Sequence, residues 1–380
     1  MHLDHLSLTN FKNIEEAHLD FSPKINCFLG NNGMGKSNLL DAIFYLSFCR
    51  SFSGVTDRML IRRGEDFAIA RARYSRRDSV EELTLGLSGG KRKSLKRGGK
   101  EYSRLSDHIG LFPIVMSAPQ DIDLIRGAGE ERRRWMNMVI SQSDKRYLDA
   151  LIRYNAGLEQ RNRMLRDGIV DHTLYEALEM TMEMAAAYIH STRSRWVSEL
   201  SRLTDRYYSA IAGDDAEEVS LTFRGSLDAP EAGSEKSLIK MLDSARRHDE
   251  IVRHTSVGPH RDDIDISLEG MSMRRTGSQG QCKTFTTALR LAQYDFLREA
   301  SGLRPMLLLD DVFDKLDSSR VERIMTLVTG SEFGQIFVTD TNRKHLDEIM
   351  AHTAGNYSMW SVRHGRFTPI LSPTDDQPTT

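Results

Sequence analysis

Residues 30–37 have the types and the spacing of a phosphate-binding loop. Their sequence, GNNGMGKS, fits the pattern G-x-x-x-x-G-K-[ST] at every fixed position. Glycines let backbone N–H groups close around an anion, because no Cβ stands in the way. The pattern places Lys36 on the β- and γ-phosphates of a nucleotide and the Ser37 hydroxyl on Mg²⁺. The residues expected to bind the nucleotide are Gly30, Asn31, Asn32, Gly33, Gly35, Lys36, Ser37 and Asn38.

The flanks of this loop predict the structure that it requires. Residues 25–29 are short and mostly apolar, which indicates a buried strand, and residues 38–46 carry apolar side chains at helical spacing. In a strand, glycine loop and helix, the backbone amides of the loop and of the helix N-terminus face the phosphates. The alternative is a chance glycine-rich turn. Such a turn would not require a strand before it and a helix after it, so the two flanks favour the phosphate loop.

Two carboxylates follow another apolar run. Residues 306–309 predict a buried strand, and Asp310 and Asp311 come directly after it. Ligands lie at the carboxyl ends of strands in α/β folds, so Asp310 is expected beside Ser37 and Mg²⁺. Asp311 is one position further out, where a carboxylate can orient or deprotonate an attacking water. The alternative is a strand that merely ends in an acidic turn; the phosphate loop favours the catalytic interpretation.

A second glycine-containing loop precedes an amphipathic helix expected over residues 283–300. It reads Ser278-Gln279-Gly280-Gln281. A serine hydroxyl, a glycine N–H and a helix N-terminus together make a second anion site. A chain with one phosphate loop and a separate γ-phosphate-binding loop can complete its site by pairing with another copy.

Basic residues concentrate between residues 91 and 100. Six cations stand in these ten residues, with Gly89-Gly90 and Gly98-Gly99 at the flanks, which predicts a flexible hairpin tip. Such a tip suits the phosphate backbone of DNA, although a solvated turn is the alternative. Arg133 and Arg134 are further candidates, with a charged helix face as the alternative. The expected DNA contacts are Lys91, Arg92, Lys93, Lys96, Arg97, Arg133 and Arg134.

The composition argues against several classes of protein. The 380 residues are 39% hydrophobic, and the formal net charge is only −2, so global charge says nothing about nucleic acid. Cys27, Cys49 and Cys282 are scattered without a C-x-x-C pair, which argues against a disulfide framework or a zinc site. The chain shows no signal peptide and no run near 18 apolar residues, so we expect a cytoplasmic protein without a membrane segment.

The order of these motifs resembles that of the ABC ATPase superfamily over nearly the whole chain. Within it, the chain closely resembles the RecF family of bacterial DNA recombination and repair ATPases. The motifs that carry this resemblance lie at residues 10–13, 30–37, 50–52, 119–121, 127–134, 258–263, 278–281 and 310–317.

The resemblance implies an α/β fold, with an ABC-type ATPase head and a mostly helical second lobe. Residues 1–120 and 301–371 would form the ATPase lobe, and residues 121–300 the helical lobe that carries the Ser278 motif. The polar residues 372–380 are expected to be a disordered tail.

The resemblance also implies roles for single residues. Gln120 would sense Mg²⁺ and water, and Asp310 would be the Walker B aspartate. Ser278 and Gly280 would bind the γ-phosphate of ATP held by the other subunit, and Asp317 would lie at the dimer interface. The further residues expected at the ATP site are Lys12 and Gln281.

The chain departs from related proteins at two positions, and the first departure bears on the rate. Asp311 stands where many ABC proteins have a glutamate, and the shorter carboxylate predicts slow hydrolysis. ABC transporters have a switch histidine after the next buried strand, whereas here Thr339 is followed by Asp340. Thr339 therefore occupies the place of the γ-phosphate switch.

The implied function is an ATP-gated switch on DNA. ATP would join two copies head to tail on double-stranded or gapped DNA, and slow DNA-dependent hydrolysis would open the dimer. RecO and RecR partners would help it to load the recombinase during recombinational repair, replication-fork maintenance and the SOS response.

Three alternatives remain. A membrane transporter ATPase is disfavoured by the missing histidine and by the basic hairpin. An SMC-type head with a long arm is disfavoured because the roughly 140 residues between Gln120 and Gly258 break at Gly168 and Gly213, which leaves an arm of only tens of ångströms. A metabolite kinase would not need Ser278 or Asp317.

Overall fold

The computed structural model describes residues 1–76, 79–227, 237–313, 316–343, 347 and 357–370. The expected tail, residues 372–380, and the motif residues Asp314 and Lys315 lie outside this range. The chain divides into two compact units: residues 1–121 with 293–380, and residues 122–292. The division falls within α9 (Gln279–Ser301), whereas the sequence places it at the end of that helix.

The first unit contains a six-stranded mixed sheet in the order β15-β14-β3-β13-β12-β8. The strands from β14 to β8 are parallel to their neighbours, and β15 pairs antiparallel with β14. β8, β12 and β13 are buried along their whole length, as parallel strands covered on both faces are. The strands are β3 Ile25–Leu29, β8 Ile114–Ser117, β12 Met306–Asp310, β13 Ile336–Asp340, β14 Tyr357–Arg363 and β15 Arg366–Pro369.

A second, antiparallel sheet of the first unit has the order β2-β1-β4-β5-β6-β7. Its strands are β1 His2–Phe11, β2 Ile14–Asp20, β4 Phe67–Arg76, β5 Ser79–Ser88, β6 Ser94–Arg97 and β7 Lys100–Glu101. The prediction of one flexible tip over residues 91–100 is wrong in part. Buried Leu95 lies opposite buried Leu85, and this apolar pair anchors β6 in the sheet.

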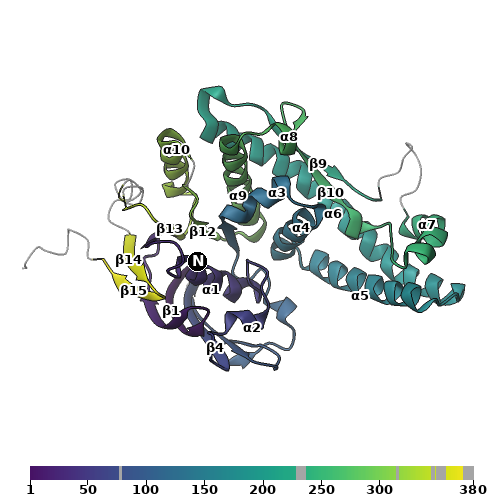
Figure 1. Cartoon of the computed structure of the whole chain (residues 1–380), viewed down its shortest axis with the longest axis horizontal. Coiled ribbons are helices and arrows are strands. Elements are labelled where there is room, and N and C mark those ends of the chain that lie inside the picture. The colour runs from purple at the N-terminus through teal and green to yellow at the C-terminus, as the bar shows by residue number, and fades with distance from the viewer. Residues whose placement is uncertain (77–78, 228–236, 314–315, 344–346, 348–356, 371–380) are drawn as a thin grey trace, which may run out of the picture. The chain divides into compact units, whose positions relative to one another are not determined.

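Helices complete the first unit (Figure 1). They are α1 Lys36–Phe48, α2 Asp57–Leu60, α10 Ser318–Thr329 and the C-terminal part of α9. Nearly every residue of α1 is buried, which explains why its sequence is apolar all round rather than on one stripe. The helix predicted over residues 38–46 is thus confirmed.

The second unit is mainly helical (Figure 1). Its helices are α3 Asp123–Arg126, α4 Gly129–Ser143, α5 Lys145–Asp167, α6 His172–Ala212, α7 Leu238–Val252, α8 Met273–Thr276 and the N-terminal part of α9. A three-stranded antiparallel sheet has the order β11-β10-β9, with β9 Val219–Arg224, β10 Asp263–Leu268 and β11 Met271–Ser272. Gly168 ends α5 in the left-handed conformation, so the predicted break at Gly168 is confirmed.

A buried ionic cluster connects α5, α6 and α7. The Arg161 guanidinium donates to Glu179 Oε1 at 2.9 Å and to Asp249 Oδ2 at 2.7 Å, and all three side chains are fully buried. Buried charges are tolerated only when they are paired in good geometry. The cluster therefore fixes how α7 docks on the hairpin of α5 and α6.

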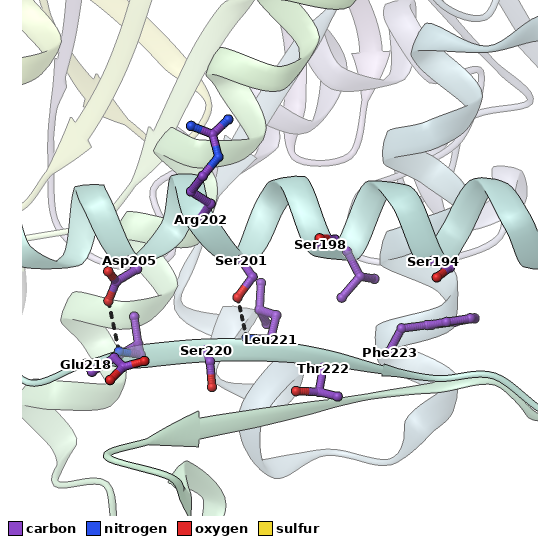
Figure 2. Close-up of a pocket in the computed structure, with 12 residues that line it drawn as sticks. Ser194, Ser198, Ser201, Arg202, Asp205, Glu218, Ser220, Leu221, Thr222 and Phe223 are labelled. Atoms are coloured by element: carbon purple, nitrogen blue, oxygen red, sulfur yellow. Dashed lines mark hydrogen bonds between the residues drawn. The ribbon is translucent and has the colours of Figure 1, made fainter. Parts of the chain in front are cut away.

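A groove of about 490 Å³ runs between α6 and the free edge of β9 (Figure 2). Asp205 Oδ1 accepts a hydrogen bond from the Val219 N–H at 3.0 Å, and Ser201 Oγ accepts one from the Leu221 N–H at 2.8 Å. These side chains of α6 satisfy edge amides that would otherwise be open to another strand. The polar lining of the groove thus has a structural explanation.

Candidate nucleotide site

The phosphate loop lies between β3 and α1, as the sequence predicts. β3 ends at Leu29 and α1 begins at Lys36. Gly33 and Gly35 have φ angles of 77° and 112°, a backbone conformation that a side chain would strain. The N-terminus of a 13-residue helix thus opens onto the loop, and its free amides favour an anion.

Lys36 is buried within the loop. Its Nζ donates to the carbonyl oxygens of Gly30 at 2.5 Å and Asn31 at 3.1 Å. Burial lowers the pKa of Lys36, and the carboxylates of Asp311, Asp310 and Asp340 oppose that decrease. The ammonium therefore lies among loop carbonyls and near three carboxylates, where phosphate oxygens can also accept its hydrogen bonds.

The Ser37 hydroxyl and the Asp310 carboxylate meet although 273 positions separate them. Ser37 Oγ donates to Asp310 Oδ1 at 2.9 Å, and Asp310 is buried at 6% exposure. Among the residues that the structure describes, no group of three or more His, Cys, Asp or Glu side chains could hold a metal. Mg²⁺ at nucleotide sites is held by one or two carboxylates together with the phosphates, so the Ser37–Asp310 pair fits this ion.

Thr339 joins this pair from the neighbouring strand. Thr339 Oγ1 donates to Asp310 Oδ1 at 2.7 Å and accepts a hydrogen bond from the Asp311 N–H at 3.1 Å. Asp311 follows β12 in the left-handed conformation, with φ at 51°. β12 and β13 thus bring both carboxylates to one edge of the sheet, beside α1.

Two turns hold the loop from outside. The Gly365 N–H, in the turn between β14 and β15, donates to the Met34 carbonyl at 2.7 Å. Asn13, in the turn between β1 and β2, accepts a hydrogen bond on Oδ1 from Asn38 Nδ2 at 2.8 Å. A Cβ on Gly365 would lie 2.4 Å from the Asn13 carbonyl oxygen, so the two turns are in close contact. The sequence interpretation missed Asn13 and Gly365 as supports; the His364-Gly365 dipeptide between β-prone segments was a usable hairpin signal.

A polar recess of about 960 Å³ adjoins these turns. It shares Asn13 and Gly365 with the supports of the loop, and Glu15, Arg62 and Arg366 are among its other lining residues. Because it lies next to the phosphate loop, its charged lining could contact a nucleoside attached to the phosphates.

Lys12, an expected ATP ligand, is paired with a residue of α1. Its Nζ lies 2.6 Å from Asp41 Oδ2, and Asp41 also accepts hydrogen bonds from Ser51 Oγ and the Phe52 N–H, each at 2.7 Å. This buried carboxylate of α1 connects the turn after β1 with the segment that follows α1. Lys12 therefore lies beside the phosphate-loop helix.

Gln120 follows β8, the strand next to β12 in the sheet. It is exposed, in a short 3₁₀ helix at Pro119–Ile122. The buried Asp121 shapes this turn, because its Oδ2 accepts hydrogen bonds from Ser117 Oγ at 3.2 Å and the Ala118 N–H at 3.1 Å. Gln120 thus lies at the same carboxyl edge of the sheet as Asp310.

The Ser278 motif caps the N-terminus of α9 in the second unit. The Ser278 N–H donates to Gln281 Oε1 at 2.7 Å, and the Gln281 N–H donates to Ser278 Oγ at 3.2 Å. This reciprocal pair is a capping box, which gives the S-x-x-Q pattern a structural role. Gln281 is occupied by the cap and by a hydrogen bond to Glu217, whereas Ser278 is exposed.

The surroundings of this helix end are cationic. Burial raises the pKa of the Cys282 thiol, and the nearby Arg126 guanidinium opposes that increase. Arg126 therefore lies beside the first turn of α9, where its charge adds to the positive end of the helix dipole.

Asp317 caps α10 in the first unit. Its Oδ1 accepts hydrogen bonds from Ser319 Oγ at 2.6 Å and the Arg320 N–H at 2.9 Å. The hydrogen bond from Ser319 is the main cause that lowers the pKa of Asp317. The carboxylate is exposed, so it is charged and accessible.

Some of the side chains expected to contact DNA are engaged in hydrogen bonds or ion pairs within the protein, and others are exposed. Lys93 Nζ donates to Tyr45 Oη at 2.9 Å and lies 3.1 Å from Asp57 Oδ2. Arg97 makes a two-pronged pair with Glu81, at 2.7 and 2.5 Å. The exposed members of the basic cluster are Lys91, Arg92, Lys96 and Lys100.

The arginines at the start of α4 hold structural contacts. Arg133 Nη1 donates to the Asp262 carbonyl at 3.0 Å, and Arg134 pairs with Glu131 one turn away. Arg132, which the sequence interpretation did not single out, is mostly buried and pairs with both Asp263 oxygens, at 2.7 and 2.9 Å. This group therefore connects α4 with β10.

Residues 258–263, for which no role is predicted from the sequence, pack within the second unit. Arg193 Nη1 donates to the Pro259 carbonyl at 2.6 Å and to Asp262 Oδ2 at 2.7 Å. His260 Nδ1 is hydrogen-bonded to Tyr154 Oη at 2.7 Å, and burial lowers the pKa of His260 to about 4. The motif thus ties α5 and α6 to β10.

The sequence of the chain is similar to a known protein family and to individual proteins of that family. A family model described as the RecF/RecN/SMC N terminal domain matches residues 2–96. The chain is 46% identical over 370 residues to the DNA replication and repair protein RecF of Parabacteroides distasonis, covering 97% of this chain and 100% of that protein. It is also 46% identical over 368 residues to the protein of that name from Porphyromonas gingivalis, covering 96% and 99%.

The chain is also similar to a solved structure of RecF. The recombination mediator protein RecF with ATP, described as part of the RecFOR pathway, matches with a TM-score of 0.86 and 27% identity, covering 97% of this chain and 98% of that one. An Smc head bound to the C-winged helix domain of ScpA matches with a TM-score of 0.57 and 17% identity, which shows the fold alone. The expected α/β head with a mainly helical second lobe is confirmed. Among the described residues, no helix is long and apolar enough to cross a membrane.

Proposed function

Because the chain belongs to the RecF family of DNA replication and repair proteins, we propose that it is an ATP-dependent, DNA-binding switch. The observation that carries this proposal is the Ser37–Asp310 pair beside the phosphate loop, at 2.9 Å. That pair and the loop together are suited to a nucleoside triphosphate with Mg²⁺. The related structure of RecF with ATP supports ATP as that nucleotide.

The phosphate loop and its neighbouring residues would divide the binding of the nucleotide and its ion. The loop amides and Lys36 would hold the β- and γ-phosphates, with the glycines giving room for close approach. Ser37 and Asp310 would hold Mg²⁺, with Gln120 at the same edge of the sheet. The ion would supply positive charge that offsets the phosphates. Lys12 supports the site through Asp41, 2.6 Å away.

Asp311 would act in hydrolysis. It would orient the attacking water and accept its proton while the new bond to the γ-phosphorus forms. The bond between that phosphorus and the bridging oxygen breaks, which yields ADP and inorganic phosphate. An aspartate reaches less far than a glutamate, so slow, DNA-dependent turnover is expected.

A second copy of the chain would complete the site. Exposed Ser278 and the Gly280 N–H lie at the positive end of α9, which suits the γ-phosphate of ATP bound to the other copy. Gln281 shapes this end through its capping box, and exposed Asp317 is suited to the interface between copies. ATP would thus act as the joint of a head-to-tail homodimer.

The dimer would act on DNA together with mediator proteins in the cytoplasm. Exposed Lys91, Arg92 and Lys96 are suited to the phosphate backbone of double-stranded or gapped DNA. The related RecF structure belongs to the RecFOR pathway, which supports RecO and RecR as partners. Recombinase loading, replication-fork maintenance and the SOS response are the processes that this assembly would serve.

The test compares Asp311→Asn with the unaltered protein in ATP binding, ATP hydrolysis and light scattering, with and without gapped DNA. We expect the variant to bind ATP, to lose hydrolysis and to accumulate as a dimer. Lys36→Ala is the matched control, and it should fail at binding itself. An Asp311→Asn variant that stays monomeric with saturating ATP would contradict the site shared between two copies. An unaltered protein without ATPase activity would contradict the proposal that the chain is an ATPase.

A further inference from the structure

We propose that Thr339 is a positioning residue of the ATPase site, which sets both carboxylates at the end of β12 through its single hydroxyl group. The side chain is fully buried at 0% exposure. It lies opposite Asp310 in the parallel register of β12 and β13. The inference rests on the proposed hydrolysis and concerns how the residues of that site are held.

The Thr339 hydroxyl both donates and accepts a hydrogen bond. A threonine hydroxyl has one hydrogen to donate and lone pairs that accept. It donates to Asp310 Oδ1 at 2.7 Å and accepts from the Asp311 N–H at 3.1 Å. One oxygen atom therefore contacts the proposed Mg²⁺ ligand and the backbone of the residue that would activate water.

The contact with Asp310 defines the orientation of its carboxylate. Asp310 Oδ1 receives two hydrogen bonds, from Thr339 Oγ1 and from Ser37 Oγ at 2.9 Å. Hydrogen bonds to a charged group are stronger than those between neutral groups, and two of them on one oxygen restrict its rotation. Without Thr339, the Ser37 hydroxyl would be the one remaining donor to this oxygen among the described residues, and Ser37 is itself a proposed Mg²⁺ ligand.

The contact with Asp311 holds a strained turn. Asp311 has φ at 51°, a left-handed conformation that side chains with a Cβ disfavour. Its N–H points to Thr339, with the carbonyl oxygen at 3.3 Å as a second acceptor. The turn brings the Asp311 carboxylate close enough to Lys36 to oppose the effect of burial on the pKa of that lysine.

The experiment compares Thr339→Val, which keeps the shape and loses the hydroxyl, with Thr339→Ser, which keeps the hydroxyl. We expect Thr339→Val to lower kcat about 10- to 100-fold, the range for losing hydrogen bonds to a charged group. The Mg²⁺ concentration at half-maximal rate should rise severalfold, while the Kd of ATP measured without Mg²⁺ stays the same. Thr339→Ser should stay within about threefold of the unaltered protein.

Thr204→Val is the matched control. Thr204 is a buried threonine of α6 whose hydroxyl donates to the Leu200 carbonyl at 2.7 Å. This change also removes a buried hydrogen bond, so it measures the effect of lost stability alone. If Thr339→Val does not fold, as judged by circular dichroism, Thr339→Ala takes its place with the same expected result.

Two results would overturn the inference. One is a Thr339→Val protein with the kcat and the Mg²⁺ dependence of the unaltered protein. The other is a Thr339→Ser protein as impaired as Thr339→Val, which would assign the effect to packing of the methyl group. Both require an active unaltered protein; absent ATPase activity in that protein would contradict the proposed function itself.

Discussion

Replacing Gly365 by alanine tests whether the hairpin of β14 and β15 supports the phosphate loop. Gly365 has φ at 76°, and a Cβ there would lie 2.4 Å from the Asn13 carbonyl oxygen. Both atoms belong to tight turns, so backbone must move to relieve the overlap. Gly99 is the matched control, because its φ is 77° and, apart from its chain neighbours, no atom of the described residues lies within 4 Å of its Cβ position.

The two variants separate strain from overlap. Gly99→Ala carries only the left-handed conformation, which costs about 1 kcal/mol. Gly365→Ala carries the same strain and an overpacking cost of about 1–3 kcal/mol. For a unit of this size the difference corresponds to roughly 2–12 °C in Tm.

The assay combines thermal unfolding by circular dichroism with titration of fluorescent ATP. We expect a lower Tm and severalfold weaker ATP binding for Gly365→Ala than for Gly99→Ala, because the Gly365 N–H to Met34 hydrogen bond must shift. Equal Tm and equal Kd for the two variants would refute the reasoning that the turn holds the loop.

Two further predictions concern pH and charge. Burial lowers the pKa of His108 to about 4, so protonation of His108 destabilises the folded protein as the pH falls from 6.5 toward 4, by up to about 3 kcal/mol. Between urea unfolding at pH 7 and at pH 5, the free energy of unfolding should decrease less for His108→Gln than for the unaltered protein. An equal decrease would contradict this role of His108. Changing Lys91, Arg92 and Lys96 to glutamate should weaken duplex binding and flatten its dependence on salt, whereas Lys93→Gln should mainly lower stability. An unchanged salt slope in the triple variant would argue against the cluster as a DNA contact.

The parts of the site that lie close together in sequence could be predicted. The loop at residues 30–37 follows from local rules, because glycine, lysine and serine at fixed spacing have few other uses between a strand and a helix. The Ser37–Asp310 pair was also predictable, since the ends of parallel strands meet at one edge of a sheet. The strand ending at Asp310 and the helix beginning after Gly35 are where the pattern placed them.

The rest depends on pairing between distant segments. The sequence shows Lys93 and Arg97 as part of a cationic run, but folding places Glu81 beside Arg97 and Asp57 beside Lys93. Charge patterns along a chain do not reveal such partners, because Glu81 meets Arg97 only when β5 and β6 align, and Asp57 meets Lys93 only when α2 has folded. Gly365 was missed for the same reason, since its contact with Asn13 joins the two ends of the chain.

The role of Thr339 could be suspected from its place and established only from its contacts. The sequence shows Thr339 at the position where the resemblance to ABC ATPases places a switch residue. It does not show that the hydroxyl meets Asp310 and the Asp311 backbone at once, because this depends on the register of β12 against β13.

The most direct test of the two-copy site mixes two inactive variants. Lys36→Ala removes the phosphate ligand of one half, and Ser278→Glu places a negative charge where the other half would bind the γ-phosphate. Each variant alone should lack ATPase activity. In an equal mixture, half of the dimers are mixed and each has one intact site, so activity should recover to about one quarter of the unaltered level. A mixture as inactive as its components would contradict a site shared between two copies.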